Sequence, residues 1–375
     1  MPALQRASDA DIEDGQGACI LFESMHASCP FREMVREARS REKRAPQKGQ
    51  PVRFWLGTHM PNWLEDPRCI DVDLFVSRST LKRRKRLPVA CTDWALDSGG
   101  FTELQLHGQW TLSPREYAAE VRRFRDEIGR LIWAAPQDWM CEPQVTEGLV
   151  KKRKPSNKRT SKINLAQWLS WARGAGPVMA KSVALAELYG DQAEIVFHGT
   201  GLSIEEHQRR TVANFLELRS VAPDLPFIPV LQGWSLYDYW RCEDLYRKAG
   251  VDLRAEPLVG VGTVCRRQGT NDATLIMRSL AASGLKLHGF GFKVLGLRAS
   301  INDLASADSL AWSKAAREDA PLPGHDKPGP GRRTGHINCA NCLEYALAWR
   351  ARLFADLADR APVRAAQQVW NWAAE

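Results

Sequence analysis

The sequence lacks long apolar runs, and this absence argues against a membrane-spanning protein. No stretch of the 375 residues approaches the roughly 20 consecutive apolar residues that a transmembrane helix needs. Residues 1–16 are acidic and polar and show no signal-peptide pattern. The sequence therefore predicts a cytoplasmic protein without a membrane partner.

Two further patterns are missing. The nine cysteines are an odd number and mostly scattered, which favours reduced thiols over a disulfide framework. No glycine-rich dinucleotide fingerprint follows an early strand, and there is no internal repeat. The missing fingerprint argues against a doubly wound nucleotide-binding sheet.

Basic residues are in excess, and they are clustered. Much of the net charge of +8 comes from residues 39–48, 82–86 and 151–162. A single charge run is usually a solvated loop. Three runs on one basic chain favour nucleic acid as a partner, because neutralised phosphates release counterions and drive binding. Some of the fourteen tryptophans are then candidates for stacking on bases.

Short apolar runs alternate with helical patterns along most of the chain. We expect eight buried strands, at residues 52–56, 89–96, 131–135, 193–197, 227–231, 258–264, 287–292 and 306–311. Helix N-caps are predicted at Ser113, Ser203, Ser235 and Thr270. The alternation predicts a parallel α/β fold, and eight units favour a (β/α)8 TIM-type barrel.

Two segments interrupt this alternation. Residues 140–165 carry the strongest basic run and are predicted as an inserted or flexible loop, whereas the proline- and glycine-rich residues 319–333 are typical of a linker or flap. We expect residues 1–318 to form the barrel, with the basic insertion around 140–165. We expect residues 319–375 to hold the linker, a small zinc-binding subdomain and a C-terminal helix from about residue 343 to 360.

Polar groups follow four of the apolar runs. The segments are residues 97–101, 134–138, 229–233 and 306–309. Carboxylates beside flexible turns at strand ends are where α/β enzymes place catalytic groups. Taken singly, Asp97 is equally typical of an Asx-turn, Asp308 of a helix cap, and Gln232 of a plain strand end. Four such ends in order along one chain favour an active site.

The segment Asp97-Ser98-Gly99-Gly100-Phe101 resembles the signature of the tRNA-guanine transglycosylase family, whose order the other strand ends follow. Residues 207–211, 260–267 and 308–312 are more similar to a DNA-directed branch, the deazapurine DNA-modification (DpdA-like) transglycosylases. The resemblance implies exchange of guanine in DNA for a 7-deazaguanine such as 7-cyano-7-deazaguanine (preQ0), without an organic cofactor. It implies DNA, the free base and accessory modification proteins as partners, in the cytoplasm of a bacterial or phage-infected cell.

The resemblance also suggests roles for single residues. Asp308 takes the family position of the nucleophile that forms a covalent glycosyl-enzyme intermediate. Asp97 suits a second carboxylate that protonates the leaving guanine and deprotonates the incoming base. Asp138 corresponds to the aspartate that accepts hydrogen bonds from N1–H and the 2-amino group. The other residues expected at the base are Gln232, Gly233, Gly260, Val261, Gly262, Ser98 and Phe101.

A histidine and two cysteines form a candidate metal site near the C-terminus. Cys339 and Cys342 make a C-x-x-C motif, and His336 lies three residues before it. Thiolates with imidazole suit tetrahedral zinc, which would hold the C-terminal segment to the barrel. The family pattern is Cys-x-Cys-x-x-Cys with a later histidine, but Ile337 holds the first cysteine position here. We therefore expect His336 to replace that cysteine and His325 to be the fourth ligand.

Basic side chains are the candidates for contacts with the nucleic-acid backbone. They are Arg266, Arg267, Lys151, Lys152 and Arg153. His207 is more typical of a structural histidine than of a catalytic one, and Arg209 and Arg210 suit either phosphate contacts or surface charge. Two alternatives stay open, a tRNA-guanine transglycosylase acting on RNA and a non-catalytic, zinc-containing nucleic-acid-binding protein. The long basic insertion and the lack of a recognisable RNA-binding tail favour DNA.

Overall fold

The structure is a computed structural model that describes residues 52–154, 161–264, 267, 270–327 and 335–358. The chain divides into two units, Met1–Pro46 and Gln47–Glu375, and all described residues lie in the second. The predicted basic run at 39–48 therefore falls outside the described residues. Within them, no helix is both long and apolar enough to cross a bilayer.

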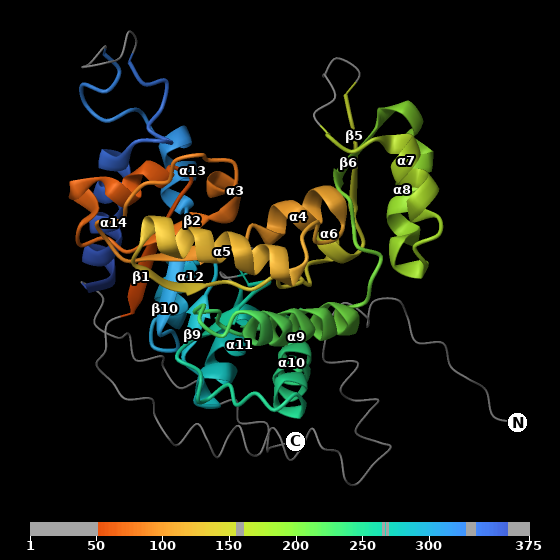
Figure 1. The fold of residues 1–375 in the computed structure, drawn as a ribbon. Helices are drawn as coiled ribbons and strands as arrows, with labels where there is room; N and C mark the ends of the chain where they lie inside the picture. Colours follow the sequence, from red (N-terminus) through yellow and green to blue (C-terminus); the bar gives the residue numbers. More distant parts are fainter. Residues whose placement is uncertain (1–51, 155–160, 265–266, 268–269, 328–334, 359–375) are drawn as a thin grey trace, which may run out of the picture. The chain divides into compact units, whose positions relative to one another are not determined.

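Eight parallel strands form one sheet that curls into a half-barrel (Figure 1). The strands are β1 (Arg53–Thr58), β2 (Leu74–Ser77), β3 (Trp94–Asp97), β4 (Leu131–Ala134), β7 (Val230–Leu231), β8 (Val259–Val261), β9 (Leu287–Gly289) and β10 (Ser306–Ser309). Their order in the sheet is β4-β3-β2-β1-β10-β9-β8-β7. A parallel bridge between Ala134 and Phe227 also links the β4 edge to the segment that leads into β7.

Helices follow the strands along the chain and pack side by side. They are α3 (Arg78–Leu81), α4 (Gly100–His107), α5 (Pro114–Ile128), α9 (Ile204–Val221), α10 (Leu236–Lys248), α11 (Asn271–Ala282), α12 (Val294–Ser300), α13 (Ala311–Glu318) and α14 (Leu343–Ala358). Helix α5 contacts α9, α9 contacts α10, and α13 contacts α14. The caps predicted at Ser113, Ser203, Ser235 and Thr270 are confirmed, since each side chain accepts a hydrogen bond from the first turn.

The sheet is apolar on both faces because successive side chains of a strand point to opposite sides. In β1, Phe54 and Leu56 join the core shared with the helices, whereas Trp55 belongs to a second cluster. That inner cluster also contains Phe75, Ala95, Trp133, Ala135 and Ile228. Burying one large apolar side chain contributes about 1.5–3 kcal/mol, so both faces stabilise the curled sheet. The same alternation places Asp97, two residues after Ala95, on the inner face.

One predicted strand forms where it was expected but belongs to another sheet. Residues 193–197 were expected in the main sheet, but β6 (Ala193–Phe197) pairs antiparallel with β5 (Leu149–Lys152) in a separate two-stranded sheet. Buried and half-buried residues alternate along β6, which is typical of a strand with one covered face. The eighth strand of the main sheet is instead β2, which was not predicted. Its apolar run of Leu74, Phe75 and Val76 is too short to stand out in the sequence.

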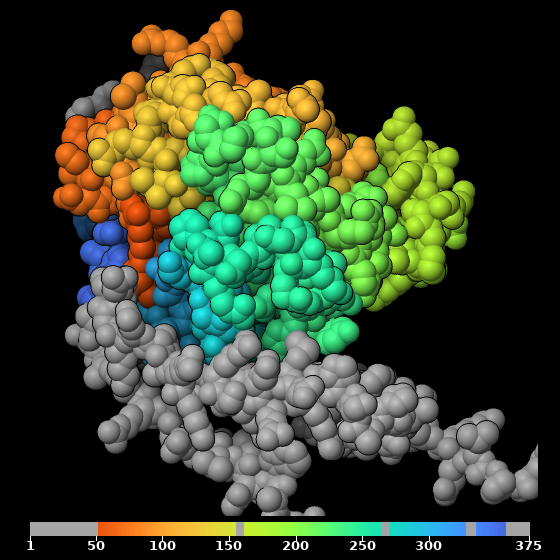
Figure 2. All heavy atoms as spheres, turned by 60° about the horizontal axis from the view of Figure 1, so that its bottom comes forward, coloured from red at the N-terminus to blue at the C-terminus, as the bar shows by residue number. Residues whose placement is uncertain are grey.

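The insertion begins within the predicted residues 140–165 but extends well beyond them, as far as β6, which pairs antiparallel with β5. It contains α6 (Pro143–Thr146), α7 (Leu165–Ala172) and α8 (Ala180–Tyr189), with a small core of its own that includes Trp168, Met179 and Ile195. The yellow-green atoms of α7 and α8 gather at one edge, next to α9 (Figure 2). Within residues 140–165, which were predicted as a loop, α6 and β5 are regular structure, and residues 155–160 of the basic run lie outside the described residues. The predicted linker is described only as far as Lys327, and the expected C-terminal helix is confirmed as α14.

Candidate functional site

A cavity of about 270 Å³ lies at the carboxyl ends of the strands. Its volume is near the lower end of the range for small-molecule pockets, about 300 to 1,000 Å³. Carboxyl and amide groups from β3, β10, the end of β7 and the segment after β4 border it. They belong to Asp97, Asp138, Glu142, Gln232 and Asp308. The predicted strand-end carboxylates therefore share one cavity, at the end of a parallel sheet where α/β enzymes hold their active sites.

Asp97 is the last residue of β3, and its partner in strand register is Ser77 of β2. The Ser77 hydroxyl and the Gly99 N–H donate to the Asp97 carboxylate. Gly99 has φ 75°, which glycine adopts without strain, so the chain turns at once into α4. Burial raises the pKa of Asp97, the Asp308 charge raises it further, and the two hydrogen bonds lower it. Because the net direction is upward, this carboxyl keeps a proton at higher pH than an exposed aspartate does.

Asp308 lies in β10, in register with Trp55 of β1. Its Oδ1 accepts a hydrogen bond from the Gly291 N–H at 2.8 Å and lies 3.3 Å from His288 Nε2. His288 is fully buried on β9, and its Nδ1 lies 2.8 Å from Ser306 Oγ. One oxygen of Asp308 is thus held from the β9 side. Sequence reasoning did not select His288, because a lone histidine in a strand carries no motif.

Asp138 and Gln232 form a buried pair. Gln232 Nε2 donates to Asp138 Oδ2 at 2.5 Å, and Gln232 Oε1 lies 2.6 Å from Thr263 Oγ1. The Gln232 side chain crosses Gly262, where a Cβ would come within 2.1 Å of Nε2, so only glycine fits there. Burial raises the pKa of Asp138 to about 7, and the Asp97 charge adds to the rise, although the hydrogen bond from Gln232 opposes it.

Helix α9 supports this pair from behind. His207 Nδ1 lies 2.6 Å from the Met140 carbonyl oxygen, and Thr211 Oγ1 accepts from the Trp139 N–H at 2.8 Å. Burial lowers the pKa of His207 to about 4, so the ring is neutral at physiological pH. Gln208 Nε2 donates to the Gln232 carbonyl at 2.6 Å. The predicted motif at residues 207–211 therefore fixes the loops that carry Asp138 and Gln232.

The two arginines of that motif are paired within their own helix. Arg209 and Arg210 both donate to Glu206, at 2.7 and 2.6 Å. The Arg210 guanidinium also lies over the Trp139 ring, 4.7 Å from its centroid. Both arginines thus have protein partners, as surface charges commonly do.

The structure brings most of the predicted base-site residues to the cavity. Those that border it are Asp97, Ser98, Phe101, Asp138, Gln232, Gly262 and Asp308. Gly233, Gly260 and Val261 lie outside its lining. The N–H groups of Gly260 and Gly262 donate to backbone carbonyls of the β7 segment. Gly233 instead lets α10 approach, since a Cβ there would meet the Asp238 Cβ at 2.7 Å.

Four residues with polar side chains at the cavity were not predicted as site residues: Thr58, Ser77, Glu142 and Thr263. Ser77 ends the strand that the sequence did not reveal, and Glu142 lies at the start of the insertion. Thr263 directly follows a predicted glycine, and both it and Glu142 are buried polar residues. The sequence signal for Thr263 was its place after Gly262 in the predicted motif at residues 260–267, which gave it no role.

Among the described residues, those predicted to contact the nucleic-acid backbone lie outside the cavity lining. Lys151 and Lys152 are exposed on β5 in the insertion, and the Arg153 N–H donates to the Gln192 carbonyl. Arg267 lies over the Trp234 ring, 4.3 Å from its centroid, and donates to the Trp234 carbonyl. Arg266 lies outside the described residues.

Residues 51–180 and 192–375 match the family DpdA, described as DeoxyPurine in DNA protein A. The chain belongs to this family. Membership confirms the resemblance seen in the sequence and connects the chain to deazapurine modification of DNA, with DNA as the substrate. Residues 1–50 and 181–191 lie outside the match, and the second of these segments falls in the insertion between β4 and β7. No curated protein matches the chain.

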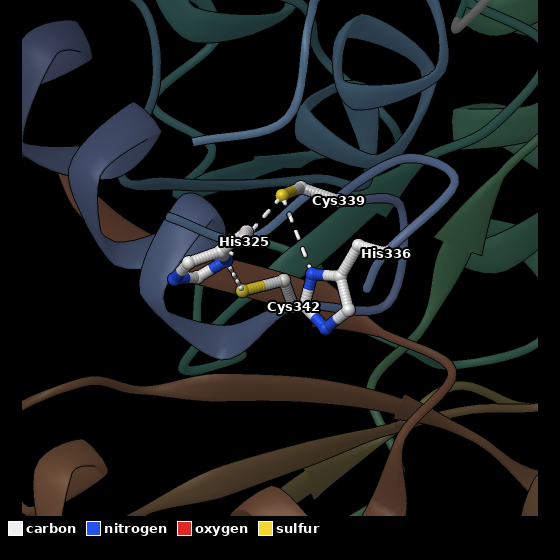
Figure 3. A group of neighbouring side chains, drawn as sticks. All are labelled: His325, His336, Cys339 and Cys342. Carbon is white, nitrogen blue, oxygen red and sulfur yellow. Dashed lines mark hydrogen bonds between the residues drawn. The ribbon is translucent and has the colours of Figure 1, made fainter. Parts of the chain in front are cut away.

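The family match extends through a Cys/His cluster near the C-terminus. His325, His336, Cys339 and Cys342 point toward one another (Figure 3), and their ligand atoms all lie within 4.8 Å. Three sulfur–nitrogen separations are each 3.6 Å. They join Cys339 Sγ to His325 Nδ1 and to His336 Nδ1, and Cys342 Sγ to His325 Nδ1. Tetrahedral zinc with bonds of about 2.3 Å to sulfur and 2.0–2.1 Å to nitrogen requires about this separation. The four residues therefore fit a metal ion, and His325 joins the cluster as expected.

Neighbouring groups orient the cluster. Glu344 Oε2 lies 3.1 Å from His325 Nε2, the ring nitrogen that faces away from the sulfurs. A carboxylate in this position fixes the tautomer of a metal-binding histidine. The Leu322 N–H donates to Cys339 Sγ at 3.5 Å, and Ser313 Oγ of α13 donates to the Ala340 carbonyl at 3.0 Å. Since α13 follows Asp308 directly, the cluster packs behind the strand end that carries Asp308.

Proposed function

We propose that this chain exchanges guanine in DNA for a 7-deazaguanine such as 7-cyano-7-deazaguanine. One observation carries the proposal. Asp97, Asp138 and Asp308 border a single cavity at the carboxyl end of a parallel sheet, in a chain of the DpdA family. The target base must leave the helix stack before C1′ of its sugar is accessible, so base flipping is part of the proposal.

In the first step, a carboxylate oxygen of Asp308 attacks C1′ as the bond from C1′ to the guanine nitrogen breaks. Oδ1 is held by Gly291, so we assign the attack to Oδ2. Asp97, whose pKa is raised, gives its proton to the leaving guanine. The result is a covalent glycosyl ester on Asp308, a free guanine and an ionised Asp97.

In the second step, Asp97 takes the N9 proton of the incoming 7-deazaguanine. That nitrogen then attacks C1′ and releases the Asp308 carboxylate. The protonation states of both aspartates are restored, so the cycle needs no organic cofactor. Dividing one displacement into two also retains the configuration at C1′.

Base recognition is assigned to Asp138 and Gln232. An ionised Asp138 accepts from N1–H and the 2-amino group of a guanine-type base, and the Gln232 amide donates to O6. Each such buried polar pair discriminates by about 1–3 kcal/mol, because a wrong base leaves it unpaired. The pKa of about 7 for Asp138 implies that base binding weakens as the pH falls below that value.

The barrel, the metal cluster and the basic side chains have supporting roles in this proposal. The bridge between Ala134 and Phe227 supports closure of the half-barrel into a (β/α)8 barrel over residues 1–318. Zinc in the Cys/His cluster of residues 319–375 would stabilise the packing behind Asp308 and take no part in the reaction. Lys151 and Lys152, with the neighbouring basic run, are proposed to hold the DNA backbone.

The proposal is tested by mass spectrometry of nucleosides from DNA produced together with the protein, in cells with and without a source of 7-cyano-7-deazaguanine. Purified protein is then assayed for exchange of labelled guanine in DNA and, side by side, in tRNA. We expect exchange in DNA, and Asp308→Ala should reduce it by at least about 10³-fold. Asp303→Ala is the matched control, because Asp303 lies just before β10 and away from the cavity lining.

Each other outcome contradicts a separate part of the proposal. Turnover on tRNA alone would assign the chain to RNA, and normal exchange by Asp308→Ala would remove Asp308 as the nucleophile. Salt-dependent DNA binding with no exchange, unaffected by Asp97→Asn, would favour a non-catalytic binding protein.

A further inference from the structure

Thr263 has an unusual backbone conformation at the edge of the cavity. It follows β8 and Gly262, is buried, and has φ 58°. Positive φ is strained for a β-branched residue and persists only where surrounding contacts compensate for it. Strained residues of this kind concentrate at ligand sites, and Thr263 borders the cavity beside Gln232.

The hydroxyl of Thr263 joins three other groups. Oγ1 accepts from the Cys141 N–H at 2.9 Å and lies 2.6 Å from Gln232 Oε1 and 3.2 Å from Glu142 Oε2. A hydroxyl has one hydrogen to donate. An amide oxygen cannot donate, so the short contact to Gln232 Oε1 requires the hydroxyl hydrogen to lie there. The direction of hydrogen bonding therefore runs from Cys141 through Thr263 to Gln232.

The other end of the Gln232 amide has a matching partner. Its nitrogen donates to Asp138 Oδ2. If the amide were turned by 180°, its oxygen would face an ionised carboxylate, and two acceptors would meet without a hydrogen. With Asp138 ionised, only the observed orientation satisfies the hydroxyl, the amide and the carboxylate together.

We infer that Thr263 is a positioning residue that sets which purine bases this site accepts. Held by its hydroxyl, Gln232 keeps the carbonyl turned to Thr263 and its N–H groups toward Asp138 and the cavity. The cavity edge then combines an acceptor, Asp138, with a donor, Gln232. This inference rests on the proposed function and adds a prediction about the 6-position of the base: a 6-oxo purine is accepted and a 6-amino purine rejected.

Thr263→Val removes the hydroxyl while keeping the shape of the side chain. Gln232 is then free to turn its carbonyl toward the base, which suits a 6-amino group. We expect the ratio of affinities for guanine over 2,6-diaminopurine to fall by about tenfold or more, the effect of one lost hydrogen bond of this kind. Calorimetric titration of the protein with each base alone measures this ratio without turnover.

Two further variants separate the hydroxyl from the strained backbone. Thr263→Ser keeps the hydroxyl and should restore the ratio. Thr263→Gly relieves the strain at positive φ, remains folded if valine does not, and should lower the ratio as valine does. The part of the preference that Asp138 contributes should remain in both variants, because 2,6-diaminopurine has no N1–H to donate to it. In a Gln232→Met background, Thr263→Val should change the ratio no further, because Thr263 acts through Gln232.

The outcomes distinguish this inference from the proposed function. If the unaltered chain binds neither guanine nor 7-cyano-7-deazaguanine, the proposed function fails. If it binds them and Thr263→Val and Thr263→Gly keep the full preference for guanine, only the role of Thr263 is overturned. An equal loss in Thr263→Ser would likewise overturn it, since the hydroxyl is then not the deciding group.

Discussion

The carboxylate cavity and the Cys/His cluster are assembled in opposite ways. The cavity draws its aspartates from distant parts of the chain: strand pairing sets the positions of Asp97 and Asp308, and contacts with α9 hold the loop that carries Asp138. The cluster draws its four residues from two nearby loops at residues 325 and 336–342. The cavity therefore depends on contacts between segments far apart in the chain, whereas the cluster depends mainly on residues close together in the chain and on the neighbouring groups that orient them.

The two regions also contribute to stability with opposite sign. In the cavity, carboxyl groups are buried near one another, and the pKa values of Asp97 and Asp138 rise because the charged forms are disfavoured. A bound metal would instead make folding more favourable at the cluster. Burial of the carboxyl groups that serve the proposed reaction therefore lowers the free energy of unfolding at neutral pH, whereas a metal bound at the cluster would raise it. Three substitutions test this contrast.

The largest effect is expected for Asp97→Asn. It removes the proposed proton donor at nearly constant size, so guanine exchange should fall by about 10²–10⁴-fold. The thermal unfolding midpoint at neutral pH should stay unchanged or rise, because a carboxyl with a raised pKa does not favour the folded state there. The two measurements are the exchange rate and a thermal melt.

Asp93→Asn is the matched control for that variant. Asp93 precedes the same strand at its amino end and pairs with Arg53 and Arg130. It should lower stability slightly and leave exchange intact, the reverse of Asp97→Asn. A similar loss of exchange in both variants would show that the cavity end of the sheet is not special.

The next effect is the pH dependence of stability at Asp138. The carboxyl has a pKa of about 7 in the folded chain against about 3.9 when unfolded, so stability falls as the pH rises between these values. Asp138→Asn removes that dependence. We expect the variant to gain up to about 4 kcal/mol in free energy of unfolding at pH 8 and little below pH 4, while exchange is lost.

Urea denaturation at a series of pH values measures this gain. A gain that is the same at pH 5 and pH 8 would contradict the raised pKa of Asp138. Asp244→Asn serves as the comparison, because the pKa of that carboxyl is lowered by Lys248 and Arg247. Its removal should lower stability above pH 4, although only slightly for a surface pair.

The smallest effect is expected at the cluster. Glu344→Gln weakens the orientation of His325 and should reduce zinc affinity by about tenfold, measured by competition with a coloured chelator. With zinc in excess, the exchange rate should match that of the unaltered chain. Glu318→Gln, on the surface of α13 beside Lys314, should leave both quantities unchanged. A slower exchange at saturating zinc would mean that the cluster is part of the active site.

Much of the fold was predictable from the sequence, because caps and apolar periods are local signals. The serine and threonine caps at the starts of α5, α9, α10 and α11 are confirmed where they were predicted. The run at residues 193–197 was assigned to the wrong sheet, and β2 was not predicted. The two failures have different causes: strand length and composition do not say which partner a strand will find, and the apolar run of β2 is too short to stand out.

The candidate site was predictable only in part. Motif order led to the three aspartates and to Gln232, which the structure places at one cavity. It also led to Gly260 and Val261, which lie outside the lining. It did not lead to Ser77, and it included Thr263 only as a member of the motif at residues 260–267, without a role, because serine and threonine at strand ends are too common to stand out.

The polar residues at the strand ends and the residues of the C-terminal cluster could be identified from the sequence, because their motifs are recognised from spacing along the chain. Tertiary structure alone decided that Ser77 meets Asp97, that Thr263 meets Gln232, and that β6 leaves the main sheet. The physical reason is that hydrogen bonds and burial between distant segments depend on strand register and helix packing. Those contacts bring the side chains of Asp97, Asp138, Asp308 and Gln232 to one cavity and raise the pKa values of Asp97 and Asp138.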